Sequence, residues 1–313
     1  KVLWRTLLLT RNPLTGTILL FSGEDNQTLK MAESLAKKRD LQVIGSIEKP
    51  IQAEKLLEML SCHTPTLRQH KPVESVNVTP EMLEAAIDAG EVKPWFQPKI
   101  QISNRKPVSV EALARWPNSA CGPIYPSDFI PVAEKHGLIH KLTYSIIEQV
   151  ADMESLWRRQ GVDLQIAVNI AMDTLYENQF VETLEKLIIR GGSSLDKFQL
   201  EVTESQLMGD FVRPLEVLLR LRMKKIKLSI DDFGTGHSNL SQLRDLPFDE
   251  LKLDRSYVHP DASRERTGLI LESTVEMAKK LGMSIIAEGV ENIEEWQRVE
   301  ELGCDLVQGY FTA

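Results

Sequence analysis

The chain has 313 residues, of which 42% are hydrophobic and 26% are charged, and its net charge is −8 at pH 7. No apolar run approaches the ~20 residues of a membrane-spanning helix, and the N-terminal segment lacks a signal-peptide cleavage pattern, so we expect no membrane association. The negative charge argues against a broad nucleic-acid interface but leaves room for a compact phosphate ligand held through metal ions.

The cysteines carry information about the compartment. Cys62, Cys121 and Cys304 are odd in number and far apart, so they indicate neither a disulfide framework nor a metal-ligand pair. A reducing, cytoplasmic location is the natural expectation.

The first 60 residues alternate between helical and strand patterns. Buried strands are predicted at 15–23 and 41–47, and helices at 1–11, 26–38 and 52–60. This alternation implies a parallel sheet, but two strands are too few for a stable sheet domain, so the segment looks like half of one. Residues 61–80 carry three prolines and no apolar period, which predicts a linker.

Residues 81–313 form the second predicted domain, which contains eight strand-like segments. They are 94–100, 107–116, 164–171, 198–204, 226–233, 250–258, 283–291 and 305–311. Helical patterns at 126–160, 180–190, 214–224 and 268–282 separate most of them and predict a (β/α)₈ TIM-like barrel. Only "QISNRK" joins the first two strands, which is too short for a parallel crossover, so the first strand should be antiparallel. The last strand ends near residue 313, and we expect the closing helix to follow it.

Acidic side chains recur at the ends of these strands. Side-chain alternation places five polar residues on the inner barrel face near the C-terminal strand ends, namely Glu111, Asn169, Glu201, Asp231 and Glu288. Converging carboxylates repel one another unless cations bind, and an oxygen-only set suits Mg²⁺ or Mn²⁺. Asp231 and its neighbour Asp232 could serve two ions, an arrangement known for phosphoester cleavage. The alternative is that each acid is a solvated strand end or a helix cap.

These residues resemble the EAL-domain family, phosphodiesterases that hydrolyse cyclic di-GMP (c-di-GMP). The family name matches Glu111-Ala112-Leu113, and the blocks "FQPK", "EALAR", "VNIA", "EVTES", "DDFGTG", "LKLDRS", "AEGVE" and "QGYF" follow in order. The resemblance implies one metal ion at Glu111, Asn169, Glu201 and Asp231, and a second at Asp231, Asp232 and Glu288. It further implies that the ions are Mg²⁺ or Mn²⁺ and that Ca²⁺ inhibits.

The resemblance also implies roles for residues around the metal ligands. Lys252 would orient the attacking water or the phosphate, and Gln308 would support that water. Arg115, Leu113, Gln97 and Glu291 are expected near the substrate, although Lys252 could be an exposed lysine and Glu291 a helix-start acid. Glu204 would brace the loop 233–243, which contributes to a homodimer contact in the family. His237 and Asn239 depart from the family's usual Tyr and Ser there, which puts loop packing and dimer coupling in doubt.

The first domain resembles the C-terminal half of a flavodoxin-like response-regulator receiver. Ser22 ends its first strand, and Lys49-Pro50 follows its second, as in that family. The phosphoacceptor Asp would lie upstream of Lys1, with a sensor histidine kinase as partner; alternatively, Ser22 and Lys49 are ordinary turn and surface residues. Three functions stay open: hydrolysis of c-di-GMP to linear pGpG under receiver control, c-di-GMP binding without cleavage, and another phosphohydrolase activity.

Overall fold

The computed structural model describes residues 17–22, 42–48, 77–119, 122–204, 212–233, 246–258 and 264–312. The chain divides into two compact units, Lys1–Glu74 and Ser75–Ala313. In the first unit, β1 (Thr17–Ser22) and β2 (Gln42–Glu48) pair in parallel, with Thr17 opposite Gln42. The helices predicted around them, Lys49-Pro50 and most of the predicted linker lie outside the described residues. The receiver therefore stays a prediction.

The second unit is a closed barrel, as the sequence predicts. Among the described residues, eight strands form it: β3 (Lys93–Gln101), β4 (Lys106–Ser119), β6 (Gln165–Asn169), β7 (Phe198–Thr203), β8 (Lys227–Phe233), β9 (Glu250–Leu253), β10 (Ser284–Glu288) and β11 (Leu306–Gln308). The predicted antiparallel first strand is confirmed, because β3 runs antiparallel to both β4 and β11. A short strand, β5 (Gly122–Ile124), pairs with the end of β4.

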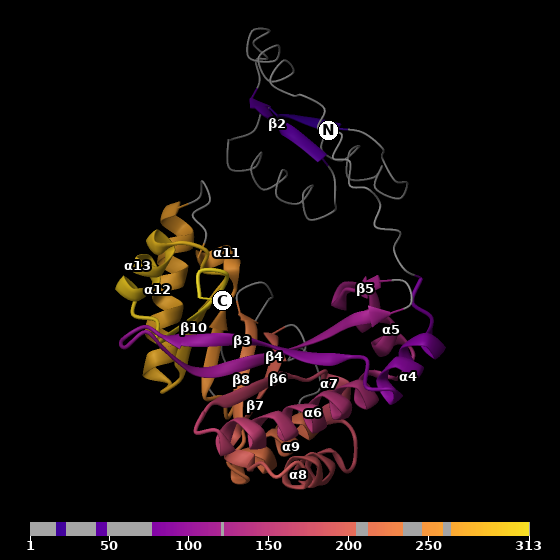
Figure 1. Ribbon diagram of the computed structural model, residues 1–313. Coiled ribbons are helices and arrows are strands. Elements are labelled where there is room, and N and C mark those ends of the chain that lie inside the picture. Colours follow the sequence, from indigo (N-terminus) through magenta and orange to yellow (C-terminus); the bar gives the residue numbers. More distant parts are fainter. Residues whose placement is uncertain are drawn as a thin grey trace. The chain divides into compact units, whose positions relative to one another are not determined.

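Helices surround the strands (Figure 1). They are α4 (Pro80–Asp88), α5 (Pro126–Lys135), α6 (Ile139–Arg159), α7 (Met172–Leu175), α8 (Phe180–Arg190), α9 (Val212–Met223), α11 (Arg255–Val258), α12 (Arg264–Lys280) and α13 (Ile293–Glu301), with the 3₁₀ turn η2 (Leu195–Lys197). None of the helices within the described ranges is long and apolar enough to cross a membrane.

Several elements differ from the sequence-based expectation. The helical pattern 126–160 contains two helices, because Gly137 adopts a positive φ of 69° between α5 and α6. Residues 255–258 form α11 instead of extending the strand that begins at 250, because the side chain of Asp254 accepts a hydrogen bond from the Ser256 amide at 2.9 Å and starts a turn. Helix α13, whose N-cap is Asn292, was not predicted, and neither were helix α4 and the short elements β5, α7 and η2.

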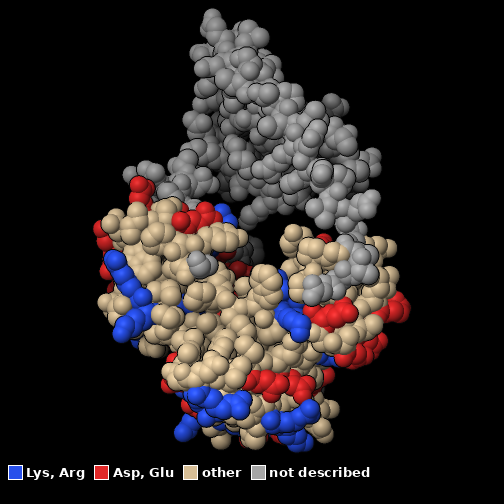
Figure 2. Space-filling view, viewed as in Figure 1, with Lys and Arg blue, Asp and Glu red and all other residues tan. Residues whose placement is uncertain are grey.

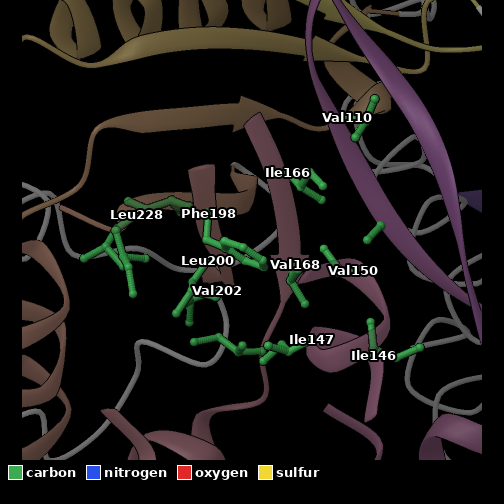
Figure 3. Close-up of a cluster of buried hydrophobic side chains, with 14 of the residues drawn as sticks. Val110, Ile146, Ile147, Val150, Ile166, Val168, Phe198, Leu200, Val202 and Leu228 are labelled. Carbon is green, nitrogen blue, oxygen red and sulfur yellow. The ribbon is translucent and has the colours of Figure 1, made fainter. Parts of the chain in front are cut away.

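The apolar core lies between the barrel strands and the outer helices (Figure 3). Val110, Ile166, Val168, Leu200 and Val202 project from β4, β6 and β7, and α6 supplies Ile146, Ile147 and Val150. These apolar strand residues alternate with polar ones, so packing the apolar side chains against the outer helices points the polar side chains into the barrel.

On the face shown in Figure 2, basic and acidic side chains of the described residues are intermixed.

Candidate functional site

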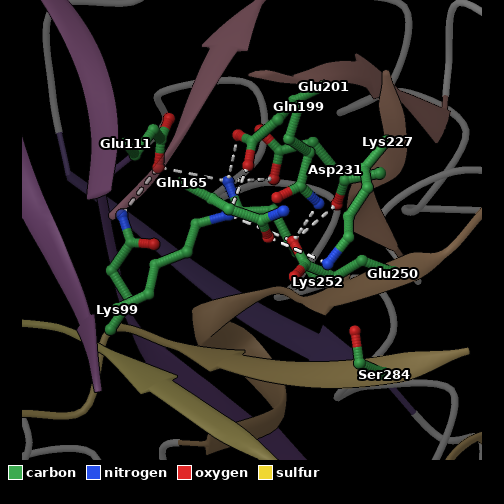
Figure 4. Close-up of polar contacts among 12 residues, drawn as sticks. Lys99, Glu111, Gln165, Gln199, Glu201, Lys227, Asp231, Glu250, Lys252 and Ser284 are labelled. Carbon is green, nitrogen blue, oxygen red and sulfur yellow. Dashed lines mark hydrogen bonds and ion pairs between the residues drawn. The ribbon is translucent and has the colours of Figure 1, made fainter. Parts of the chain in front are cut away.

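Lys252 on β9 lies at the centre of a buried cluster of carboxylates. Its side chain is 1% exposed, and its Nζ lies 2.7 Å from Glu201 Oε2 and 2.8 Å from Glu288 Oε1. Asp231 Oδ1 is at 3.0 Å and Glu111 Oε2 at 3.2 Å. The four carboxylates come from β7, β10, β8 and β4, so barrel closure brings them to one ammonium group. Figure 4 shows Glu111, Glu201 and Asp231 around Lys252.

The cluster strongly shifts the ionisation of its members. Burial by itself lowers the pKa of Lys252, but the carboxylates, led by Glu201, raise it well above its ordinary value. Burial also raises the pKa of Glu201, yet Lys252 and Lys99 outweigh it and bring that pKa down to about 2. Burial followed by the Glu201 charge raises the pKa of Glu111. Burial raises the pKa of Glu288 to about 8, with Asp231 adding to the effect. The site thus holds more negative charge than its lysine neutralises.

Amide side chains hold the two oxygens of Glu111. Asn169 Nδ2 donates to Oε1 at 2.6 Å, and Gln308 Nε2 donates to Oε2 at 2.6 Å. Gln308 Nε2 also donates to Gln97 Oε1 at 3.1 Å. The side-chain oxygen of Gln308, Oε1, is buried and has no hydrogen-bond partner among the described residues. An unpaired buried acceptor is costly, so this atom marks a place for a donor such as water.

Close approach of two chain segments fixes Gln308 at the end of β11. A Cβ on Gly309 would lie 2.2 Å from the Val290 oxygen and 2.4 Å from the Val290 nitrogen. The Val290 amide donates to the Gln308 carbonyl at 3.2 Å, and Phe311 donates to the Val290 carbonyl at 3.0 Å. Only glycine permits this contact, which joins the ends of β10 and β11 beside the cluster.

Two groups of three acids could each hold a metal ion, and they share one member. Glu111, Glu201 and Asp231 form the first, and Asp231, Asp232 and Glu288 the second, with ligand atoms in each group within 4.8 Å of one another. Asp232 adopts a positive φ of 55°, which is uncommon outside glycine and is tolerated best by Asn and Asp. Burial and the neighbouring Asp231 and Asp254 raise the pKa of Asp232. An all-oxygen set with excess negative charge fits a hard divalent cation.

The other sequence-predicted residues surround this cluster. Arg115 and Leu113 lie on β4 beyond Glu111, opposite Lys93 and Trp95 of β3. The Arg115 guanidinium donates to the Ala114 carbonyl at 2.9 Å, and no ion pair engages it within the described part of the chain.

Two further predicted residues lie at the edge of the site. Glu291 faces Arg255, with Glu291 Oε1 3.2 Å from the guanidinium, and it immediately precedes the N-cap of α13. Glu204 is buried directly after β7. The loop that Glu204 is predicted to brace, including His237 and Asn239, lies mostly outside the described residues.

A second polar layer inside the barrel was not predicted from the sequence. Lys99 on β3 has no exposed surface and contacts Glu201 as well as Glu250 on β9. Gln199 and Ser229 also donate to Glu250. The available signal was alternation: Lys99 lies two residues from Gln97 and therefore on the same strand face. Asp254, directly after β9, was also not predicted, although it lies two residues from Lys252 and the same alternation applies to it.

A family model described as "EAL domain" matches residues 80–313. Cyclic di-GMP phosphodiesterase RocR of Pseudomonas aeruginosa is 30% identical over 306 residues, covering 96% of this chain and 78% of RocR. Cyclic di-GMP phosphodiesterase PA2567 of the same species is 32% identical over 218 residues, covering 70% of this chain. The match spans only 37% of PA2567's own length.

Solved structures agree with the sequence comparisons. The structure titled "PaMucR Phosphodiesterase, c-di-GMP complex" superposes with a TM-score of 0.70 at 33% identity, covering 74% of this chain and 95% of that one. The EAL enzyme Bd1971 in its cAMP-bound form superposes with a TM-score of 0.67 at 26% identity, covering 85% of this chain and 73% of that one. Because the family model covers the whole closed barrel and all the strands that carry the acidic cluster, this chain belongs to the EAL-domain family.

Proposed function

We propose that this protein hydrolyses c-di-GMP to linear 5′-pGpG with two divalent metal ions, Mg²⁺ or Mn²⁺. The observation that carries the proposal is the pair of acidic groups sharing Asp231. Two acidic groups that share a ligand are an arrangement that suits two-metal phosphodiester cleavage. The activity named for RocR and PA2567 and the ligand in the PaMucR title support the same substrate.

The formal charge of the interior supports two ions. Six carboxylates (Glu111, Glu201, Asp231, Asp232, Glu250 and Glu288) surround two lysines, Lys99 and Lys252. Fully ionised, this set keeps four uncompensated negative charges, which is the charge that two divalent ions neutralise. Burying ionised carboxylates without a compensating positive charge costs several kcal/mol for each carboxylate.

Each side chain then has a defined task. Glu111, Asn169, Glu201 and Asp231 would hold one ion, and Asp231, Asp232 and Glu288 the other. When bound, the ions supply Lewis acidity, polarising the phosphate and lowering the pKa of water.

The remaining groups act on water and substrate. The Lys252 ammonium orients groups in the cluster and balances charge that develops on phosphate oxygens. The Gln308 side-chain oxygen, which has no hydrogen-bond partner among the described residues, accepts a hydrogen bond from water. The Arg115 guanidinium, which donates to the Ala114 carbonyl and forms no ion pair within the described ranges, binds a substrate phosphate. Leu113 and Gln97 would line the substrate site, and Glu291 and Glu204 would support its loops.

A product analysis tests the proposal. Purified protein is incubated with c-di-GMP and Mg²⁺, Mn²⁺ or Ca²⁺, and the nucleotides are separated by chromatography. We expect pGpG with Mg²⁺ or Mn²⁺, and binding with poor turnover in Ca²⁺, which is larger and tolerates looser coordination geometry. Binding without any pGpG would instead identify a c-di-GMP-binding module, and equal rates in Ca²⁺ and Mg²⁺ would contradict the assigned metal roles.

Regulation by the N-terminal unit is part of the proposal. The RocR match covers 96% of this chain and therefore extends into residues 1–74. The parallel pairing of β1 with β2 is compatible with half of a receiver sheet. A homodimer through the loop after β8 or through the receiver, and a sensor histidine kinase as partner, follow from the family resemblance. Analytical ultracentrifugation tests the dimer.

A further inference from the structure

Lys99 is a lysine without solvent contact in the middle of the barrel. Its Nζ lies 2.7 Å from Glu201 Oε1 and 3.0 Å from Glu250 Oε1, and its side chain is 0% exposed. Burying an ammonium group is expensive unless carboxylates compensate it, so these two contacts must both be kept in the folded chain. Barrel interiors are usually filled by branched apolar residues, which makes this cation unusual at its position.

Glu250 binds the Lys99 ammonium and belongs to neither of the two acidic groups that could hold a metal ion. Its Oε1 receives three donors: Lys99 Nζ, Gln199 Nε2 at 2.7 Å and Ser229 Oγ at 3.1 Å. These partners come from β3, β7 and β8, and Glu250 itself comes from β9. The network therefore joins four strands and leaves the ammonium, which contacts β7 and β9 directly, little freedom to move. A rigid, fully paired polar network of this kind can hold a neighbouring group in one orientation.

That neighbouring group is Glu201. Lys99 donates a hydrogen bond to Glu201 Oε1, and Lys252 donates to Glu201 Oε2 at 2.7 Å within the acidic cluster (Figure 4). Lys99 contacts Glu201 as well as Glu250, so it links the Glu250 network to the acidic cluster. Without Lys99, rotation of the carboxylate would be opposed only from the Lys252 side.

We propose that Lys99 is a positioning residue for the metal cluster: by holding Oε1 of Glu201, it presents only Oε2 to the ions. Glu250, Gln199 and Ser229 form the support that holds Lys99 in place. Lys99 touches neither substrate nor ion and acts through Glu201. This inference rests on the proposed function only in requiring that the cluster binds divalent ions.

Calorimetric titration of the full chain with Mn²⁺, without nucleotide, tests the proposal. Lys99→Met removes the ammonium and keeps a side chain of similar length. We expect Mn²⁺ affinity to fall by about 10–100-fold, the range for lost partners of metal ligands. Hydrolysis of c-di-GMP should recover largely at saturating Mn²⁺. Unchanged or increased affinity in a folded Lys99→Met protein would overturn the proposal, since loss of the ammonium charge by itself favours Mn²⁺ binding.

Two control variants separate positioning from stability. Lys141→Met removes an exposed lysine that pairs with Glu84 and Asp88 on the barrel exterior, and should leave Mn²⁺ affinity unchanged. Leu184→Ala creates a cavity under α8, where Leu184 is 0% exposed, and should lower the melting temperature without weakening Mn²⁺ binding. If Leu184→Ala weakened Mn²⁺ binding as much as Lys99→Met, the effect would be general destabilisation and the proposal would be wrong.

A double-mutant cycle tests the route through Glu201. In a Glu201→Gln background, Lys99→Met should change Mn²⁺ affinity little, because the oxygen that Lys99 orients is no longer a carboxylate ligand. Additive effects would refute an action through Glu201. Should Lys99→Met fail to fold, Glu250→Gln loosens the same support with an isosteric amide. It should still weaken Mn²⁺ binding severalfold, and unchanged binding would refute the proposal.

The calorimetric readout keeps this test separate from the proposed function. Wild-type protein that binds Mn²⁺ but releases no pGpG would contradict phosphodiesterase activity and leave the role of Lys99 testable. If wild-type protein bound no Mn²⁺, the acidic cluster would not be a metal site, and both the proposed function and the role of Lys99 would be wrong.

Discussion

Replacing Lys252 by Met should destabilise the metal-free protein far more than the metal-loaded one. The Lys252 ammonium is 1% exposed and contacts four carboxylates within 3.2 Å. Removing one partner of a buried ion pair costs about 3–5 kcal/mol, because the other charges lose their compensation. For a domain of this size, about 2–4 °C of melting temperature corresponds to 1 kcal/mol, which gives a loss of about 6–20 °C. The lower end is expected, because Glu111 and Glu288, whose pKa values burial raises, can take up protons.

Divalent ions should restore much of this loss, because they neutralise the same carboxylates. Ions at 100 times the dissociation constant stabilise wild type and variant alike by about 2.7 kcal/mol, so the loss shrinks to the extent that the variant, with one more uncompensated carboxylate charge, binds the ions more tightly. The assay is thermal unfolding followed by circular dichroism, in EDTA and in saturating Mn²⁺, for wild type and Lys252→Met. Lys224→Met, which removes a partly exposed pair with Glu185, is the matched control and should lose little under either condition. An equal loss for Lys252→Met in EDTA and in Mn²⁺ would show that the ammonium and the ions do not share the cluster.

Three further predictions follow from named contacts. Burial raises the pKa of Glu288 from 4.5 to about 8, so without metal its contribution to stability is full below about pH 4.5 and is lost as pH rises through about 8. Urea unfolding in EDTA should show this decline in wild type, and Glu288→Gln should flatten it; an unchanged slope would argue against the assignment. Glu204→Gln should lose activity that high Mn²⁺ partly restores, because a bracing residue only weakens the second ion site, whereas Glu201→Gln should resist rescue. The test measures the hydrolysis rate of both variants at increasing Mn²⁺ concentration. If both variants recovered, or neither did, the assignment of Glu204 to loop support and Glu201 to metal binding would be wrong. Gly309→Ala forces a Cβ to 2.2 Å from the Val290 oxygen and should cost about 1–3 kcal/mol in chemical denaturation, so wild-type stability would contradict the close contact.

Local patterns predict much of the fold. Period-two alternation identifies the barrel strands, and the six residues between the first two require the antiparallel pairing that β3 shows with β4. Where expectation and structure differ, the cause is short range but easily overlooked. Gly137 divides one long helical pattern into α5 and α6, and the Asp254 side chain ends β9 by bonding to the Ser256 amide.

The acidic residues were identifiable because alternation assigns each to the inner face, and converging acids need cations. Which groups touch is a different matter, because it depends on how far each strand is shifted against its neighbours when the barrel closes. That shift brings Lys252 into contact with carboxylates from four other strands and sets Lys99 between Glu201 and Glu250. Sequence alone therefore determined the strands, their inward faces and the oxygen-rich chemistry. Only the tertiary structure decided that two buried lysines divide the oxygens of Glu201, because contacts between residues 51 and 102 positions apart arise from barrel closure.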